Sequence, residues 1–146
     1  MIVIDASVLA PALIDDAADG DLLRRRIRGE RLAAPALIDL EVLSMFRRAA
    51  RTRDLEQRRS KQAVTDLAAL PLRRVPHLAL LVRICELRDS LSVYDPGHVA
   101  LAEALRAPLL TADPGIADAP AVRCKVELWV EASTTLREAV VVVSTA

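Results

Sequence analysis

Short, uninterrupted aliphatic runs alternate with helix-like segments along this chain, and this alternation limits its fold more than any other feature. The run Ile2-Val3-Ile4 carries apolar side chains on both faces, as strands do when a sheet is covered on both sides. Further strands are predicted at residues 31–34, 71–76, 108–111 and 122–128, and helices at 7–14, 21–28, 35–51, 54–70, 77–88 and 95–106. Such an order predicts an α/β fold in which helices cover a parallel sheet.

Residues 1–130 are expected to form one domain, because no linker, repeat or low-complexity segment interrupts them. Residues 131–146 are set apart as a C-terminal extension of unknown role, which contains four successive valines at 140–143. Aromatic residues make up 2% of the chain, so the core must be aliphatic. No signal-peptide pattern and no apolar run near the ~20 residues of a membrane span are present, so we expect a cytoplasmic protein without membrane contact.

The formal net charge is zero, so no global field attracts nucleic acid, but the arginines are clustered. One group comprises Arg24, Arg25, Arg26, Arg28 and Arg31, and the other Arg47, Arg48, Arg51, Arg53, Arg58 and Arg59. Two interpretations are open for these groups: solvated helix faces, or a local rim that binds phosphates. Cys85 and Cys124 lack the spacing of metal ligands, and we expect both to be buried and reduced.

Four acidic residues stand where this fold would normally place apolar or neutral side chains. Asp5 ends the first strand, Asp113 closes the apolar run 109–112, Asp95 opens a helix, and Glu41 interrupts an apolar helical stretch. Ligands of parallel α/β folds bind beyond the carboxyl ends of the strands. We therefore expect acids from distant parts of the chain to meet at one rim of the sheet.

These acids have no obvious Lys or Arg partner in the sequence pattern. An ionised carboxylate is costly to bury alone, so such a group usually neutralises, pairs or binds a metal. Converging carboxylates repel one another, and a hard divalent cation with oxygen ligands removes that repulsion. The pattern predicts a site for Mg²⁺ or Mn²⁺.

Five segments carry a resemblance to a known family: residues 4–9 (IDASVL), 35–43 (PALIDLEVL), 94–95 (YD), 100–105 (ALAEAL) and 109–113 (LLTAD). Together, and in this order, they resemble the PIN-domain ribonucleases, and within them the VapC-type toxins of bacterial toxin–antitoxin pairs. The resemblance covers roughly residues 1–128. It implies a three-layer α/β/α sandwich with a central parallel sheet, and metal-dependent endonucleolytic cleavage of RNA.

The resemblance also implies roles for particular residues. The catalytic and metal-binding acids of the family correspond to Asp5, Glu41, Asp95 and Asp113. Ser7 and Thr111 match polar positions that support the first and last acids. Two protein partners are implied: an antitoxin whose C-terminal segment covers the cleft, and a second copy of the chain in a homodimer.

The sequence departs from the family pattern in two places. Residues 96–98 read Pro-Gly-His where the family has aromatic or apolar residues, and Pro114-Gly115-Ile116-Ala117 separates Asp113 from the next acid, Asp118. The contribution of Asp118 is therefore open. These departures keep open the alternative of a catalytically silent PIN-like module that binds nucleic acid or protein.

Each acid also has a purely structural interpretation. Asp5 and Asp95 could cap the helices that follow them, and Asp113 could initiate a turn. Glu41 is placed well inside its helix, where it cannot be a cap, so its structural alternative is a surface residue; Asp39 is expected to be solvated on another side of the helix.

Other polar residues are assigned structural roles. Ser7 is expected to cap a helix or to support Asp5, and not to act as a nucleophile. His98 is interpreted as a partly exposed surface imidazole, and Glu103 as a packing or salt-bridge residue. A phospho-receiver domain is the rival α/β enzyme, but neither Lys61 nor Lys125 suits the strand-end lysine that it requires.

Overall fold

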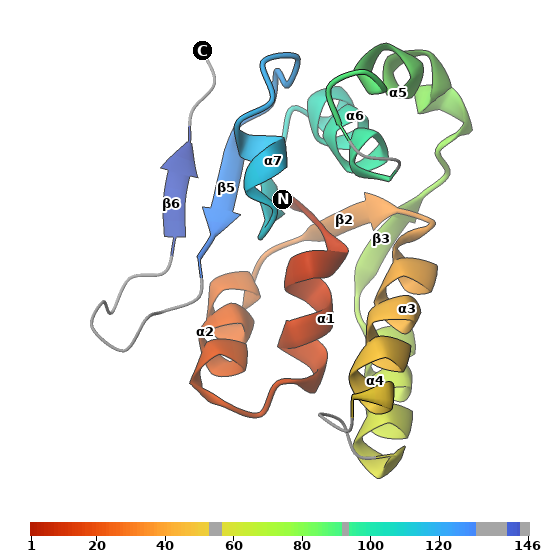
Figure 1. Ribbon diagram of the computed structural model, residues 1–146, viewed down its shortest axis with the longest axis vertical. Coiled ribbons are helices and arrows are strands. Elements are labelled where there is room, and N and C mark those ends of the chain that lie inside the picture. Colours follow the sequence, from red (N-terminus) through yellow and green to blue (C-terminus); the bar gives the residue numbers. More distant parts are fainter. Residues whose placement is uncertain (53–56, 92–93, 131–139, 144–146) are drawn as a thin grey trace.

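The computed structural model describes residues 1–52, 57–91, 94–130 and 140–143. These residues form one six-stranded sheet in the order β3-β2-β1-β4-β5-β6, in which the first five strands are parallel and β6 is antiparallel to β5 (Figure 1). The strands are β1 (Ile2–Ile4), β2 (Leu32–Pro35), β3 (Leu72–Val75), β4 (Leu109–Thr111), β5 (Val126–Trp129) and β6 (Val140–Val143).

Helices cover both faces of this sheet, which confirms the predicted α/β/α sandwich with a central parallel sheet (Figure 1). The described helices are α1 (Ala6–Ile14), α2 (Ala18–Ile27), α3 (Ile38–Arg51), α4 (Gln57–Ala69), the 3₁₀ turn η1 (Leu78–Leu80), α5 (Leu81–Leu87), α6 (Asp95–Leu105) and α7 (Pro114–Ala117). Among the described residues, none of these helices is long and apolar enough to cross a membrane.

Successive residues of β1 face opposite layers, as strand geometry requires. Ile2 and Ile4 pack into the core shared with helices α1 to α4, whereas Val3 packs into the core shared with α5, α6 and α7. All three side chains are at most 1% exposed. The continuous aliphatic run is thus explained by burial of the strand on both sides.

The chain reverses its direction across the sheet between β1 and β4. From β1 it proceeds through β2 to β3 on one side, and it then returns to place β4 and β5 on the other side. A crevice opens at such a switch point, outside the carboxyl ends of the two central strands. Asp5 follows β1 and Ala112 follows β4, so the topology places the segments after both strands at this point.

Several predicted boundaries are wrong, and Pro35 gives the clearest case. We expected Pro35 to start a helix, but it ends β2, where its carbonyl side still pairs in parallel register with Val75. The helix α3 begins only at Ile38. Likewise α2 begins at Ala18 instead of residue 21, and β5 begins at Val126 instead of Val122.

The segment set apart as a C-terminal extension contributes β6 to the sheet. The four residues of β6 pair with Val126–Trp129 in antiparallel register. The first part of the fourth predicted helix, residues 54–56, and the remainder of the extension lie outside the described residues.

Candidate active site

Asp5 stands at the junction of β1 and α1, and its carboxylate faces the switch point. It occupies the N-cap position of α1, but its side chain makes no capping hydrogen bond. Instead, Oδ2 accepts hydrogen bonds from Ser7 Oγ at 2.6 Å and from Thr111 Oγ1 at 2.7 Å. The capping interpretation of Asp5 is therefore wrong, because Oδ2 accepts from two side-chain hydroxyls and Oδ1 lies near His98, and neither oxygen accepts from the helix backbone.

Ser7 and Thr111 tie the ends of β1 and β4 together. The Ser7 hydroxyl accepts a hydrogen bond from the Ala112 backbone N–H at 2.9 Å, and Thr111 Oγ1 accepts one from the Asp113 backbone N–H at 3.0 Å. Both hydroxyls are thus used to orient Asp5 and the backbone after β4. Ser7 lies inside α1 and supports Asp5, as one of the two predicted alternatives for it stated.

Glu41 projects from the first turn of α3 toward Asp5 and Asp95. We had placed it well inside the helix, which is wrong because α3 begins at Ile38. Burial, followed by repulsion from Asp5 and Asp95, raises the pKa of Glu41 to about 7. Its Oε2 atom is buried and lacks a hydrogen-bond partner among the described residues. A carboxylate in this situation favours an arriving proton or cation.

His98 occupies the space between Asp5 and Glu41. Its Nε2 atom lies 3.5 Å from Glu41 Oε2 and 3.9 Å from Asp5 Oδ1. The prediction of a partly exposed surface imidazole is wrong, because the side chain is 0% exposed. Burial lowers the pKa of His98, against the opposing effect of the Asp5 and Asp95 charges.

Asp95 is the first residue of α6, after Tyr94 at the N-cap. Its charge acts on both Glu41 and His98, which places it with them. Asp5, Glu41, Asp95 and His98 are called the acid cluster below. It unites three of the four predicted acids from β1, α3 and α6.

Asp113 joins this group indirectly. Its Oδ1 accepts a hydrogen bond from the Gly115 N–H at 2.7 Å and caps the four-residue helix α7, as the turn interpretation predicted. Its link to the acid cluster runs through Thr111, which receives the Asp113 N–H and donates to Asp5. Asp118 is exposed at the other end of α7.

The donor set of the acid cluster suits a hard divalent cation. In the described part of the chain, Asp5 and Glu41 have His98 as their one basic neighbour within 4 Å. No three His, Cys, Asp or Glu side chains among the described residues converge closely enough to hold a metal as they stand. The raised pKa and the orphaned oxygen of Glu41 are the observations that a cation with oxygen ligands would explain.

Comparison with known proteins identifies the family. The sequence model of the PIN domain matches residues 2–122, which is most of the chain.

The chain belongs to the PIN domain family.

Within that family it belongs with the VapC ribonucleases. Ribonuclease VapC9 of Mycobacterium tuberculosis is 39% identical over 126 residues, covering 86% of this chain and 96% of VapC9. Ribonuclease VapC12 of the same organism is 35% identical over 128 residues, covering 88% of this chain and 98% of VapC12. The resemblance inferred from the five sequence segments is thereby confirmed.

A solved structure shares the fold. The crystal structure of VapBC2 from Rickettsia felis, bound to a DNA fragment from its promoter, matches with a TM-score of 0.61. The match covers 86% of this chain and 98% of that chain at 13% identity. At that identity the likeness supports the PIN-like architecture alone.

The arginine groups divide into structural and exposed members. Arg24 donates to the carbonyls of Ala12 and Asp15, and Arg26 pairs with Glu127. Burial opposes ionisation of Glu127, but the hydrogen bond from Arg26 outweighs it and lowers the pKa. These two arginines therefore hold α2 against α1 and β5, and neither is available to bind phosphates.

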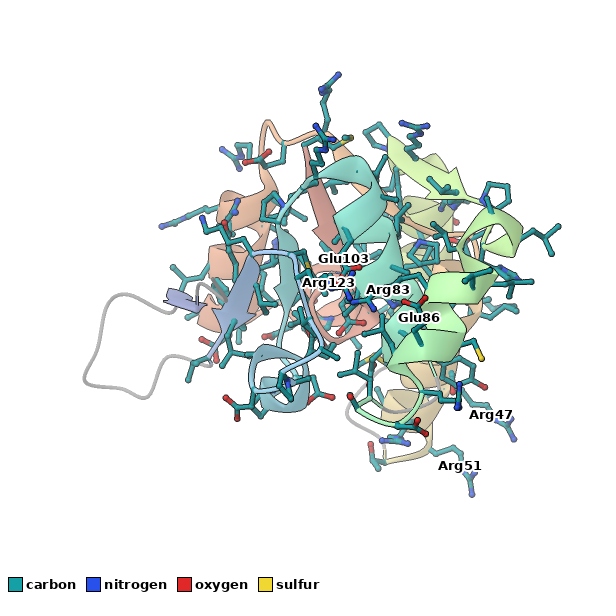
Figure 2. The ribbon with its side chains drawn as sticks, turned by 90° about the horizontal axis from the view of Figure 1, so that it is seen from above. Arg47, Arg51, Arg83, Glu86, Glu103 and Arg123 are labelled. Carbon is teal, nitrogen blue, oxygen red and sulfur yellow. The ribbon has the colours of Figure 1, made fainter. Side chains whose placement is uncertain are left out.

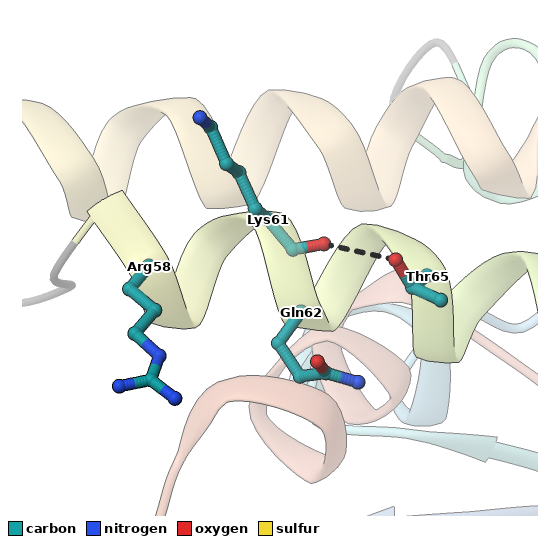
Figure 3. A pocket seen from close by; sticks show the side chains of 4 residues that line it. All are labelled: Arg58, Lys61, Gln62 and Thr65. Atoms are coloured by element: carbon teal, nitrogen blue, oxygen red, sulfur yellow. Dashed lines mark hydrogen bonds between the residues drawn. The ribbon is translucent and has the colours of Figure 1, made fainter.

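Other basic residues face solvent. Arg47 and Arg51 point outward from α3 (Figure 2), and Arg58 and Lys61 line a pocket of about 380 Å³ on α4 with Gln62 and Thr65 (Figure 3). Within α4, the Thr65 hydroxyl donates to the Lys61 carbonyl at 3.3 Å. The phosphate-rim interpretation thus remains for exposed members of the second group, whereas Arg53 lies outside the described residues.

Two further acids and the two cysteines differ in how well their roles were predicted. Asp39 is only partly exposed and is paired, because Arg74 donates to both of its oxygens at 2.7 and 2.8 Å. Glu103 forms the predicted salt bridge, with Arg83 as its partner. Cys124 is buried as expected, but Cys85 is exposed.

Proposed function

We propose that this protein is an endoribonuclease that depends on Mg²⁺ or Mn²⁺ and serves as the toxin of a toxin–antitoxin pair. The observation that carries the proposal is the approach of Asp5 and Glu41 to the same nitrogen of His98, with burial and the charges of Asp5 and Asp95 raising the pKa of Glu41 to about 7. Membership of the VapC ribonucleases supports the choice of RNA as substrate.

The acids would hold the cation, with Asp5, Glu41 and Asp95 as the principal ligands and Asp113 as a further one. A bound divalent cation lowers the pKa of a water molecule and offsets charge on the leaving oxygen of the phosphodiester. Ser7 and Thr111 fix Asp5 through Oδ2, so the position of its Oδ1 is set before any ligand arrives. This preorganisation reduces the reorganisation that binding requires.

A groove between helices supports the proposal of an antitoxin partner. It has a volume of about 460 Å³ and lies between α1, α2 and α4, with Leu9, Leu13, Ile27 and Leu70 in its apolar wall. Charged side chains stand along it, namely Asp16, Arg24, Arg59 and Asp66. An apolar groove with a charged rim suits an amphipathic peptide segment, such as the C-terminal segment of an antitoxin.

We also propose that the protein forms a homodimer in the cytoplasm. The structure exposes Leu40 on α3, Leu78 on η1 and Val82 on α5, each with more than 70% of its surface accessible. Exposed apolar side chains of this size are typical of interaction surfaces when they are contiguous. Sedimentation equilibrium at micromolar concentration should give twice the mass of the chain, and a monomer would contradict this part of the proposal.

RNA cleavage with controlled metal content tests the activity. Purified protein is incubated with a pool of structured RNAs in EDTA, Mg²⁺ or Mn²⁺, beside Asp5→Asn and the control Asp89→Asn, whose acid is exposed on the surface. We expect cleavage by the wild type and D89N only when metal is present, and none by D5N. Metal-independent cleavage, or full activity of D5N, would refute the proposed site.

A silent binding module gives a different result in the same assay. It would leave every RNA intact in all metal conditions, even after removal of any copurified antitoxin.

A further inference from the structure

His98 is buried without the partners that a structural histidine normally has. Its side chain is 0% exposed, and neither Nδ1 nor Nε2 meets the geometry of a full hydrogen bond among the described residues, although an interaction with the Tyr94 backbone favours the protonated ring and opposes the lowering of its pKa by burial. A buried polar group left in this state costs on the order of 1–3 kcal/mol. Such a cost is expected to persist at a functional site, where the missing partner is supplied by another state of the protein.

Packing of the helix backbone fixes the position of the ring, in addition to its interaction with the Tyr94 backbone. The first turn of α6 lies against the β2–α3 connection, where Gly97 faces the side chains of Pro35 and Leu37. His98 follows Asp95 by three residues, so both side chains project from the same face of α6. This packing directs the ring into the space between β1 and α3.

The nearest charged groups are the acids that would hold the cation. Nε2 lies 3.5 Å from Glu41 Oε2, the other buried atom that lacks a partner in the described structure. It lies 3.9 Å from Asp5 Oδ1, the oxygen that Ser7 and Thr111 leave open. A neutral imidazole carries one N–H, and at Nε2 that N–H could serve either carboxylate after a small movement.

We propose that His98 is a positioning residue of the cation site, whose Nε2–H donates to Glu41 Oε2 and so orients both Glu41 and Asp5 for the metal. This inference rests on the proposed metal-dependent function, and adds a residue to it. The side chain acts through the carboxylates and does not itself contact the ion. Groups that orient metal ligands in this way typically change metal affinity by about 10–100-fold when removed.

Three substitutions separate the donor from the shape of the ring. His98→Gln places an amide N–H near the position of Nε2, His98→Asn places it near Nδ1, and His98→Phe removes both nitrogens while keeping the ring. His77→Gln is the control, because His77 is exposed at the start of η1. Calorimetry measures the Kd for Mn²⁺ and for Mg²⁺, and thermal unfolding in EDTA reports the metal-free fold.

We expect H98F and H98N to weaken binding of both cations by about 10–100-fold, and H98Q and H77Q to remain within about threefold of the wild type. H98F should unfold in EDTA at or above the wild-type temperature, because it removes two unsatisfied nitrogens. Should H98F fail to fold, the difference between H98Q and H98N carries the test.

Two results would overturn the inference. Equal affinities of H98Q and H98N would show that the position of the donor is irrelevant. A much larger loss for Mn²⁺ than for Mg²⁺ would make the imidazole a direct ligand, since nitrogen ligands favour Mn²⁺. In either case D5N must still abolish cation binding. If D5N binds cations normally, the proposed metal site itself has failed, whatever the His98 variants show.

Discussion

The fold holds two groups of half-buried acids that differ in one respect, the presence of an arginine. The first group is called the arginine bridge. In it, the Glu103 carboxylate on α6 accepts hydrogen bonds from the Arg83 guanidinium of α5 at 2.7 and 3.0 Å, and from the Arg123 backbone N–H at 2.9 Å (Figure 2). In the acid cluster, Glu41 has side-chain exposure nearly equal to that of Glu103, 16% against 14%, but no arginine reaches it in the described structure.

The pKa values of the two glutamates move in opposite directions. Burial disfavours ionisation of Glu103, but the hydrogen bonds from Arg83 and from the Arg123 backbone outweigh it, and the pKa falls. Burial raises the pKa of Glu41, and repulsion from Asp5 and Asp95 raises it further, to about 7. Equal burial with opposite outcomes shows that the partner decides the state of a buried acid. Arg83 offsets the charge of Glu103, whereas no arginine in the described structure offsets the charge of Glu41, which we propose is the role of a bound cation.

Removing the charge of Glu41 should have the largest effect on activity. Glu41→Gln keeps the volume but removes a ligand, so we expect RNA cleavage to fall by about 10³-fold, or about 4 kcal/mol of transition-state stabilisation. The same change should not destabilise the metal-free protein, because it removes repulsion from Asp5 and Asp95. Initial cleavage rates and urea unfolding in EDTA measure the two effects.

The contrast between Glu41 and Glu103 would be contradicted if E41Q unfolded more readily than the wild type in EDTA. That result would mean that Glu41 is stabilised by the chain itself, as Glu103 is.

Removing the arginine of the bridge should have the converse effect. Arg83→Met leaves Glu103 and Glu86 without their cation, and we expect a loss of about 2–3 kcal/mol in the free energy of unfolding. Metal affinity should be unchanged. Arg88→Met is the control, since its side chain is 63% exposed and should change stability by less than about 0.5 kcal/mol. An R83M protein as stable as R88M would show that the bridge contributes no stability.

The pH dependence of stability should distinguish the two glutamates. The folded pKa of Glu41, about 7, exceeds the unfolded value of 4.5, so its contribution is complete below pH 4.5 and is lost as pH rises through 7. The folded pKa of Glu103 is below 4.5, so its contribution is present above pH 4.5 and is lost on further acidification. His98, with a lowered pKa, opposes the Glu41 slope.

Comparison of the wild type with E41Q in EDTA measures the contribution of Glu41 together with its coupling to His98, which lies 3.5 Å away. The stability of E41Q relative to the wild type should increase by on the order of 1–2 kcal/mol between pH 5 and pH 8. Urea midpoints at several pH values measure this change, and a constant difference would contradict it.

The smallest expected effect concerns Asp39, two residues before Glu41 on α3. Its partner Arg74 is present, and the hydrogen bonds that this arginine donates to Asp39 raise the pKa of Arg74. Asp39→Asn weakens a partly exposed pair, so we expect a loss of about 1 kcal/mol in stability and no change in Mn²⁺ affinity. Weaker Mn²⁺ binding in D39N would extend the cation site beyond the acid cluster and blur the contrast between acids paired with arginine and the Glu41 carboxylate.

The sequence was sufficient for the sheet and for most of the acids, because both depend on local patterns. Ile2-Val3-Ile4 ending at Asp5, and the run 109–112 ending at Asp113, identify parallel strands and the rim where their ends meet. The first residues of the helices were harder to predict from the sequence. Proline suits both the end of a strand and the first turn of a helix, and pairing with Val75 decided for Pro35.

His98 could not be placed from the sequence, because its position depends on how α6 packs on the rest of the fold. The segment Pro96-Gly97-His98 fits the start of an exposed helix equally well, and only contact with the β2–α3 connection turns the ring inward. The spacing of Asp95 and His98 was the available signal, since two polar residues three apart share a helix face. For Asp39, the missing information was the position of Arg74 across the layer.

A crystal structure with bound Mn²⁺ tests the central claim most directly, because the anomalous signal of the metal locates it independently of the acids. The account predicts one or two ions at the switch point, with carboxylate oxygens of Asp5, Glu41 and Asp95 about 2.0–2.2 Å away. An acid cluster that stays free of metal at saturating Mn²⁺, or ions bound only elsewhere on the protein, would contradict it.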